Sequence, residues 1–540
     1  MIDASVRYAD IGSAVSVSGG GEVTFGKSRL SPYLHAALDY KILYNEHRIL
    51  LVCREKCKQA IDFRVGQHEH ILTEDPSDFE DEIAGVAGWP NAAIAIDISR
   101  EIGAPGIRIF TNHNPNTCVY VWASYAEFRV SWDYNAVARS SCQNTINLHQ
   151  LSRWLMMHGY AYDSQTIFAN IFRVTVDSEV FASPHRLRIT QRDRRREYAP
   201  REMARDVPFQ NILEEYINAA ISRRKLGADR VVCEVSGGLD SAVLLLLASR
   251  LIPSLSAAGI AVSASFGQPV NQTIRQRKIT ASLNVPLLLV DIAQHLPFSP
   301  DSPRREPFCT SYMAEPFHEA FFSLTEKLRL GGYDTLISGV GGNEAFPLFP
   351  SDDGFTNSYP GITRSNPSCV FITREAFLLA QSAQVTSNYT LPYVAPALQA
   401  VEARHQRLLL QGMWSINPFL EPEIIQFGSS LPPHLRKDRL LLKQVLSAVG
   451  LRDFLVDIHD SFESSILDTL VRSNQLMRQL CQDSVCADVG LIEPSRLWTC
   501  YEDVCRRGCI VPGLRQAAFH IIMFMHMELF LGHYRRGGYI

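Results

Sequence analysis

The residues best equipped for chemistry lie in one short turn, residues 235–241, with the sequence VSGGLDS between an apolar run and a helical segment. Its two glycines permit positive φ and let backbone amides approach a ligand closely, and the following helix start offers free N–H groups and a positive dipole end. Serine hydroxyls add donors, and the aspartate adds a hard oxygen ligand for Mg²⁺. The turn therefore predicts a phosphate and metal site made by Val235, Ser236, Gly237, Gly238, Asp240 and Ser241.

The alternative is a glycine-rich turn in which the aspartate and serine only cap the helix. From average composition, Ser-Gly-Gly-x-Asp-Ser arises by chance in roughly one in a thousand chains of this length. Its position after an apolar strand favours function further. The turn also lacks the lysine of the Gly-x4-Gly-Lys-Ser/Thr loop of γ-phosphate transferases, so we expect a different bond to break.

The second half alternates apolar strands with helices. The pattern predicts strands at 231–236, 260–267, 285–292 and 334–342, with helices at 241–252 and 271–284. Such alternation is typical of an α/β domain with a parallel sheet covered on both faces, whose ligands bind at the carboxyl ends of the strands. Three Gly- or Ser-rich turns fall at those ends, at 236–241, 265–267 and 338–343.

The first half has a different pattern. From residue 48 to 189, short runs rich in Val, Ile and Tyr are separated by turn residues, with one helical segment at 147–160, which predicts a mainly β α+β domain. A polar, arginine-rich stretch at 190–207 predicts a linker. We place the domains at 1–205 and 206–540.

Composition narrows the classes of function. Of 540 residues 46% are hydrophobic and 20% charged, and the net charge is −4, so no global attraction to nucleic acid or membranes is expected. The start of the chain has neither a basic nor an apolar targeting segment, and the twelve cysteines form no secreted framework, which indicates a cytoplasmic protein. The spacings from Cys481 to Cys509 are too loose for a typical zinc site. No apolar run reaches the ~18 residues of a membrane span.

Further segments carry a family resemblance. The ends of two later strands hold Phe266-Gly267 and 336–344, LISGVGGNE, and they are followed by 417–421, NPFLE, and by Lys443. In this order the second half resembles the ATP pyrophosphatase domain of the asparagine synthetase group, which includes asparagine synthetases, β-lactam synthetases and lasso peptide cyclases. The resemblance implies an adenine nucleotide α-hydrolase-like fold that uses ATP and Mg²⁺. It also implies adenylation of a carboxylate with release of pyrophosphate, then attack by an amine with release of AMP.

The resemblance assigns roles to single residues. Phe266, Gly267, Ser338 and Gly339 would contact the nucleotide, Lys443 the phosphates, and Asp240, Asn343 and Glu344 the metal. The sequence departs from the family at two positions of the second turn. Asn343 replaces a metal-binding Asp, and Val340 replaces the Glu or Tyr that assists deprotonation of the amine. Where the family has a catalytic lysine segment, His459 is the candidate base here.

The first half resembles a degenerate glutaminase domain of the N-terminal nucleophile type. Ile2 stands where active members carry the nucleophilic cysteine, so the amine-activated thiol is missing and glutamine hydrolysis is not expected. The segments 106–128 and 147–174 carry the resemblance. Its expected role is to support the ligase half.

Without internal ammonia, the amine must come with a substrate. The segment 339–343, GVGGN, resembles the Gly-x-Gly-Gly-Asp turn of lasso cyclases, in which the N-terminal amine of a precursor peptide attacks its adenylated side chain. The leading interpretation is macrolactam formation on such a peptide, with a leader-peptide-binding protein or a protease as partners. The alternatives are an amide or β-lactam synthetase for small natural-product precursors, and a pseudoenzyme that binds nucleotide or peptide without turnover.

Overall fold

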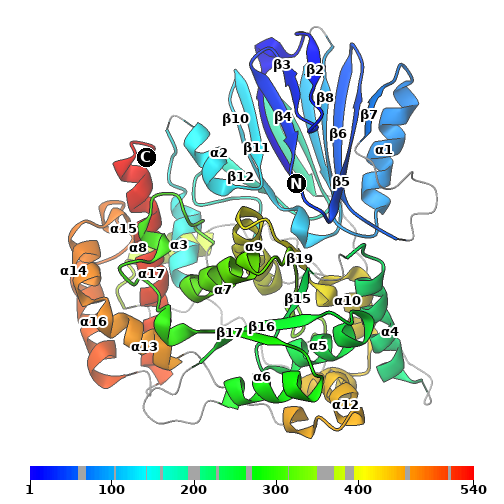
Figure 1. Ribbon diagram of the computed structural model, residues 1–540. Helices are drawn as coiled ribbons and strands as arrows, with labels where there is room; N and C mark the ends of the chain where they lie inside the picture. Colours follow the sequence, from blue (N-terminus) through cyan, green and yellow to red (C-terminus); the bar gives the residue numbers. More distant parts are fainter. Residues whose placement is uncertain are drawn as a thin grey trace.

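The computed structural model describes most of the chain in two connected parts, an upper β-rich part and a lower α/β part (Figure 1). The described residues are 1–58, 69–101, 105–141, 143–157, 162–191, 207–226, 230–262, 271–313, 315–349, 370–382, 395–455, 463–508 and 512–540. The expected domain boundary near residue 205 lies outside them, between the last strand of the first part and the first helix of the second.

The first part is a sandwich of two seven-stranded sheets. The first sheet has the order β12 (Ile171–Val174), β10 (Val119–Ala123), β11 (Glu127–Ser131), β1 (Ile2–Arg7), β4 (Ser28–Pro32), β3 (Val23–Phe25) and β2 (Val15–Val17). The second has the order β14 (Arg186–Gln191), β13 (Ser178–Ser183), β9 (Gly106–Thr111), β8 (Ala93–Ser99), β6 (Arg48–Glu55), β5 (Leu38–Tyr44) and β7 (Glu69–Leu72). Neighbouring strands are antiparallel except β5 and β7.

Alternating side chains explain how the two sheets pack. Ile49 and Leu51 of β6 face the core shared with the first sheet, whereas Leu50 and Val52 face the opposite side, under helix α1 (Pro76–Gly88). Helix α2 (Tyr134–Ser140) packs on β10 and β11 of the first sheet. The layers therefore run helix, sheet, sheet, helix, which confirms the mainly β, α+β character expected of this half.

The second part contains the predicted parallel sheet. Its order is β17 (Leu287–Asp291), β16 (Ser256–Ala261), β15 (Val231–Glu234), β18 (Thr335–Ile337) and β19 (Trp414–Ile416), with every pair parallel. β16 begins four residues before the strand predicted at 260–267, because Ser256–Gly259 pairs with β15 and β17 as well. The strand order reverses between β15 and β18, and at such a switch point the two strand ends leave a crevice.

Helices cover both faces of this sheet, as the continuous apolar strands predicted. One face carries α4 (Phe209–Ser222), α5 (Leu239–Leu251), α6 (Asn271–Ser282) and α12 (Leu440–Ala448), and the other carries α7 (His318–Leu330) and α9 (Ala395–Leu410) (Figure 1). Val231 and Cys233 face the first group, and Val232 faces the second. Because both faces are buried, the strands are largely apolar, with Ser256, Thr335 and Ser415 among the exceptions.

Most of the remaining helices lie together on one side of the molecule (Figure 1): α3 (Leu148–Met157), α8 (Arg374–Ser382), α13 (Glu463–Arg472), α14 (Asn474–Gln482), α15 (Val485–Asp488), α16 (Pro494–Arg507) and α17 (Pro512–Arg536). α10 (Pro422–Ser430) packs against α4, and α11 (Pro433–Arg436) packs against α12. α17 packs against α3 and the carboxyl-terminal helices in one buried core. Among the described helices, none is long and apolar enough to cross a membrane.

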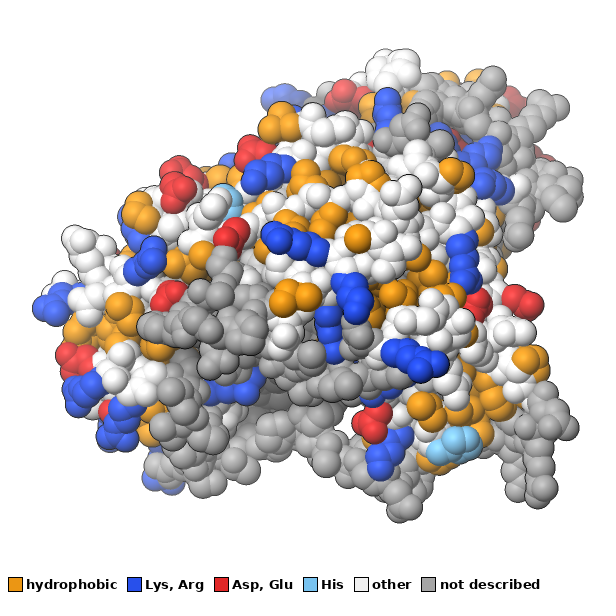
Figure 2. Space-filling view, turned by 60° about the horizontal axis from the view of Figure 1, so that its bottom comes forward, with side chains coloured by type: hydrophobic (Ala, Val, Ile, Leu, Met, Phe, Trp, Pro, Cys, Tyr) orange, Lys and Arg blue, Asp and Glu red, His pale blue; other side chains and the backbone are white. Residues whose placement is uncertain are grey.

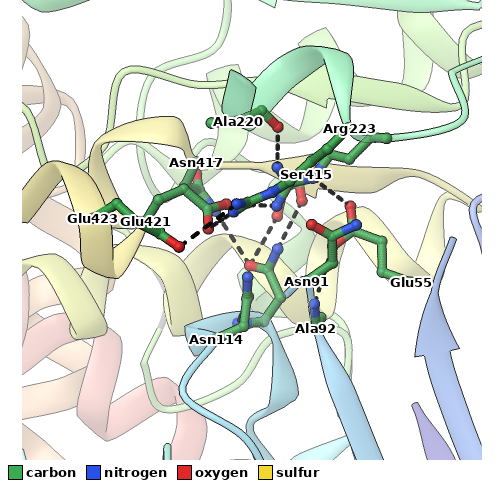
Figure 3. A network of polar contacts seen from close by, with 12 residues as sticks. Glu55, Asn91, Ala92, Asn114, Ala220, Arg223, Ser415, Asn417, Glu421 and Glu423 are labelled. Carbon is green, nitrogen blue, oxygen red and sulfur yellow. Dashed lines mark hydrogen bonds and ion pairs between the residues drawn. The ribbon is translucent and has the colours of Figure 1, made fainter. Parts of the chain in front are cut away.

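A buried polar network joins the two parts (Figure 3). The Arg224 guanidinium, 2% exposed, donates to Glu55 of β6 at 2.7 Å and to Glu421 after β19 at 2.5 Å. The Asn116 amide donates to the Ser415 carbonyl at 2.7 Å. Burial acts to lower the pKa of Arg224, but the two carboxylates outweigh it and hold that pKa above its ordinary value. Arg224 therefore stays charged in a dry junction.

Replacing Arg224 with alanine should strongly destabilise the protein, because two buried carboxylates would lose their shared cation. The expected cost is about 3–5 kcal/mol in the free energy of unfolding, measured by urea denaturation. Arg230→Ala is the control. That side chain is 62% exposed beside Asp334, so the change should stay within about 0.5 kcal/mol. Equal losses in the two variants would contradict the role given to the junction.

A buried histidine should make the fold sensitive to acid. Burial first, and the nearby Arg304 charge second, lower the pKa of His526 on α17 to about 3, so it stays neutral in the folded protein. An unfolded histidine takes up a proton below about pH 6.5, and stability is therefore lost as the pH falls through that value. The His526→Gln variant should lose about 2 kcal/mol less stability than the wild type between pH 7.5 and pH 5 in urea titrations. An identical loss in both proteins would rule this out.

Candidate functional site

The turn at 235–241 joins the carboxyl end of β15 to α5. Gly237 has φ of +79°, and a Cβ there would lie 2.5 Å from the Gln272 carbonyl oxygen, so only glycine fits. Gly238 is the N-cap of α5 and makes no side-chain cap. The first amides of the helix therefore point out of the turn with no serine or aspartate side chain closing them at the N-cap.

Two hydroxyls organise this turn from inside. Ser241 Oγ accepts from the Ser236 amide at 3.1 Å and lies 3.0 Å from Ser236 Oγ, which accepts from the Gly238 amide at 3.2 Å. Val235 is buried and is paired through its amide to Ala258 of β16 at 2.8 Å. The two serine hydroxyls therefore fix the shape of the loop. The sequence alone could not show whether they contact the loop itself or a ligand.

The second turn, Ser338 to Glu344, lies against the first. Gly341 has φ of +93°. A Cβ at Gly339 would lie 3.2 Å from the Ser241 amide nitrogen, and one at Gly342 would lie 2.4 Å from Asp240 Cγ. The glycines therefore serve close contact between the turns as well as backbone freedom. The structure brings the two motifs together at the switch point between β15 and β18.

Asp240 is paired with an arginine that the sequence reasoning missed. Its Oδ2 accepts from Arg439 Nη1 at 2.7 Å, and both side chains are about one-fifth exposed, at 17% and 21%. Asp438 and Arg439 have φ of +52° and +53°, a left-handed pair between two short helical segments. Backbone strain of this kind often accompanies functional sites. Here Arg439 contacts Asp240 of the turn at 235–241. Among the sequence signals, only its position four residues before Lys443 could have pointed to it.

The expected metal ligands divide into two groups. Burial raises the pKa of Glu344, and the nearby Asp240 charge raises it further, while Arg439 lowers it. The carboxylates of Asp240 and Glu344 therefore lie close enough to interact. Asn343 is exposed. No cluster of three or more His, Cys, Asp or Glu occurs in the part of the chain that the structure describes. The Asp240 and Glu344 pair fits a magnesium ion that takes its other ligands from phosphates and water.

Lys443 is half-buried on α12, one turn after Arg439. α12 packs against α5, the helix that follows the first turn. Arg439 is the N-cap of α12, and its bond to Asp240 places the start of α12 beside the first turn. Three other expected site residues, Phe266, Gly267 and His459, lie outside the described residues.

A second polar cluster at the strand ends also escaped the sequence reasoning. Glu234, the last residue of β15, accepts from Ser338 Oγ at 2.6 Å and from Arg404 Nη1 at 2.7 Å. Arg404 of α9 also donates to Glu315. Burial opposes the charge of Arg404, but the carboxylates hold its pKa above its ordinary value. The cluster fixes Ser338 at the start of the second turn. Ser338 was expected at the site, but no motif marks Glu234, Arg404 and Glu315, because they come from three separate segments.

Two glutamines of helix α6 contact the strand ends. Gln276 Nε2 donates to the Val235 carbonyl at 2.9 Å and to the Ile260 carbonyl at 3.0 Å, and Gln272 donates to the Ser236 carbonyl. Gly259 allows this approach of β15 and β16, since a Cβ there would lie 2.2 Å from the Val235 oxygen. The glutamines therefore satisfy the carbonyls at the strand end.

The segment NPFLE at 417–421 is structural in its contacts. Pro418, Phe419 and Leu420 are buried, and Glu421 pairs with Arg224. Leu420 also packs under the second turn, where a Cβ on Gly341 would lie 2.4 Å from Leu420 Cδ2. This segment therefore links the junction network to the site.

On the face turned forward in Figure 2, the described lysine and arginine side chains lie at several places among apolar and neutral ones, and acidic side chains are scattered between them.

Comparison with known proteins gives no family assignment. No known family pattern and no curated protein matches the sequence. Solved structures that match include the U34-tRNA thiolase NcsA from Methanococcus maripaludis with its [4Fe-4S] cluster, at 11% identity over 56% of this chain and 83% of that one, with a TM-score of 0.25. Another is the NH3-dependent NAD synthetase from Campylobacter jejuni, at 11% identity over 58% and 94%, with a TM-score of 0.20. These values are too low to assign chemistry, which must follow from the site itself.

The contact between the turns predicts the effect of one added methyl group. Gly342→Ala would place a Cβ against Asp240, so one turn must shift, at an expected cost of about 1–3 kcal/mol in urea unfolding. Gly12→Ala is the matched control because no atom lies within 4 Å of its added Cβ. A Gly342 variant as stable as the control would show that the turns are not in contact in solution.

Proposed function

We propose that this chain is an ATP-dependent ligase that adenylates a carboxylate and passes the acyl group to an amine. The observation that supports the proposal best is the meeting of two glycine-rich turns at the switch point of a parallel sheet, with Asp240 between them. Amides at a helix start and nearby cations can bind the phosphates of a nucleotide, and a carboxylate can hold the Mg²⁺ that accompanies them. The turn has no P-loop lysine, so transfer of the γ-phosphate is disfavoured.

Different residues of the two turns and of α12 would contact different parts of the nucleotide. The amides of the first turn and the start of α5 would hold the leaving pyrophosphate, and Ser338 and Gly339 the nucleotide on the β18 side. Arg439 and Lys443 border the phosphates with positive charge. Catalysis then consists of positioning and of stabilising the charge that develops on the departing pyrophosphate.

The proposed reaction has two steps. The substrate carboxylate oxygen attacks the α-phosphorus, and the bond to pyrophosphate breaks. The amine nitrogen then attacks the acyl carbon, AMP departs and the amine loses a proton. Asp240 and Glu344 would hold Mg²⁺, which neutralises phosphate charge when bound. Because Arg439 already contacts Asp240, this arginine must share or release the carboxylate as the nucleotide enters.

The amine is proposed to arrive on the substrate. Val340 is half-buried and packs against the carboxyl-terminal helical core, so it offers no base at the second turn. An amine within the same molecule has a high effective concentration and depends less on a dedicated base. Macrolactam formation on a peptide fits this best, and amide formation between small precursors is the next reading. We propose the sandwich as a degenerate glutaminase-like support, with the boundary near residue 205.

A second candidate, a binding protein without turnover, has its own support. Asp240 is occupied by Arg439, and Asn343 is exposed and neutral. If the arginine does not release Asp240, the site can bind phosphate without activating it.

Adenylation is measured by exchange of labelled pyrophosphate into ATP in the presence of candidate acids and peptides. We expect substrate-dependent exchange that falls at least about tenfold in Asp240→Ala, since charge-assisted contacts are among the strongest. Asp301→Ala, an exposed position away from the turns, is the control and should exchange normally. ATP binding without exchange for every acid would favour the binding protein, and absence of ATP binding would refute both readings.

A further inference from the structure

A separate polar cavity of about 360 Å³ lies between the start of α14 and the loop after β17. Two arginines and three glutamines are among its lining residues, and none of the described residues that line it is acidic. In a chain of net charge −4, this local excess of positive charge is unusual. The cavity shares no residue with the two turns of the proposed ligase site, so the inference below is independent of that site.

The start of α14 opens into this cavity. Ser473 is the N-cap, yet its side chain makes no capping hydrogen bond. The amides of Gln475 and Leu476, which line the cavity, have no acceptor within the described part of the chain. Open first-turn amides and the positive end of the helix dipole favour an anion there.

One buried hydroxyl on the cavity wall lacks a partner. Thr469 of α13 is fully buried, lines the cavity, and its Oγ1 has no hydrogen-bond partner among the described residues. Buried hydroxyls are normally hydrogen-bonded, and this one belongs to the wall of a polar cavity beside a helix start. Ser473 is 5% exposed and also lines the cavity.

The two arginines come from different elements, Arg305 from the segment after β17 and Arg472 from α13. Arg305 donates through Nε and Nη2 to the Phe298 carbonyl at 3.1 and 2.7 Å, which fixes its guanidinium. Burial lowers the pKa of Arg305, although Asp301 and Glu319 act against that, so an anionic partner would be favoured there. Arg472 ends α13 and makes no ion pair with a described residue.

We propose that this cavity binds the carboxylate or phosphate group of a small organic anion. The charged group lies between Arg305, Arg472 and the start of α14. The uncharged part of the ligand packs on Leu296, Phe298 and Leu476, which are almost fully buried. An adjoining cavity of about 450 Å³ shares Arg305, Leu476 and Gln479 but also contains Asp483 and Glu528, so the anionic end belongs in the first cavity.

The test uses benzoate and phenyl phosphate as probes, with benzamide as the neutral analogue, in calorimetric titrations of the full chain. We expect one or both anions to bind and benzamide not to bind. Arg472→Gln should raise the dissociation constant at least about tenfold, because one charge-assisted contact is lost. Gln479→Glu, which adds a negative charge at an exposed cavity position, should weaken binding as well.

Two controls separate this cavity from other sites. Arg496→Gln removes a charge from another exposed arginine, 61% exposed on α16, and should leave binding unchanged. Ser236→Ala alters the turn at 235–241 and should also leave anion binding in the cavity unchanged. Preference for benzoate or for phenyl phosphate identifies the anionic group. The proposal is overturned if neither anion binds, if binding survives both cavity variants, or if Ser236→Ala abolishes it.

Discussion

The buried ion pair of Arg224 with Glu55 and Glu421 is the interaction on which the rest of the structure depends. It ties the end of α4 to a strand of the sandwich and to the segment after β19. That segment continues directly into the site, since Leu420 packs under Gly341 and holds the second turn against the first. A buried charge without its partners costs several kcal/mol, so this junction can exist in only one arrangement of the two parts. The sandwich thereby positions the two turns, although none of its described residues belongs to them.

Within the site, close packing of backbone is the main constraint. At four glycines an added Cβ would contact another segment of the same chain, and at three of them the distance would be below 3.0 Å. These are Gly237, Gly259, Gly339 and Gly342. Such positions let two strand ends and two turns converge on Asp240. Two charged side chains lie near Asp240: Arg439, which donates to it, and Glu344, whose pKa its charge raises. The site is compact because side chains are absent at the contact points, and it is polar because charged groups enter from α12 and the second turn.

Much of the fold could be predicted because its signals are local. The apolar runs of β6, β8, β9 and β10 and the strand-to-helix alternation after residue 230 depend on neighbouring residues, and the structure has them at those places. The strands before residue 45 were not predicted. Short strands such as β2 and β3 are defined by pairing, of β2 with β3 and of β3 with β4, rather than by a strong pattern of their own. The early start of β16 at Ser256 has the same cause, because small residues there are selected by close approach of parallel neighbours.

The sequence by itself determined that a glycine-rich turn follows an apolar strand, that strands and helices alternate around it as in a parallel sheet, and that position 2 holds Ile rather than Cys. These are properties of consecutive residues. The tertiary structure alone decided that Asp240 pairs with Arg439, that Glu234, Ser338 and Arg404 form one cluster, and that Glu421 is held in an interdomain ion pair. Each of these links residues about 65 to 200 positions apart, whose meeting depends on strand order and helix packing and leaves no periodic signal in the chain.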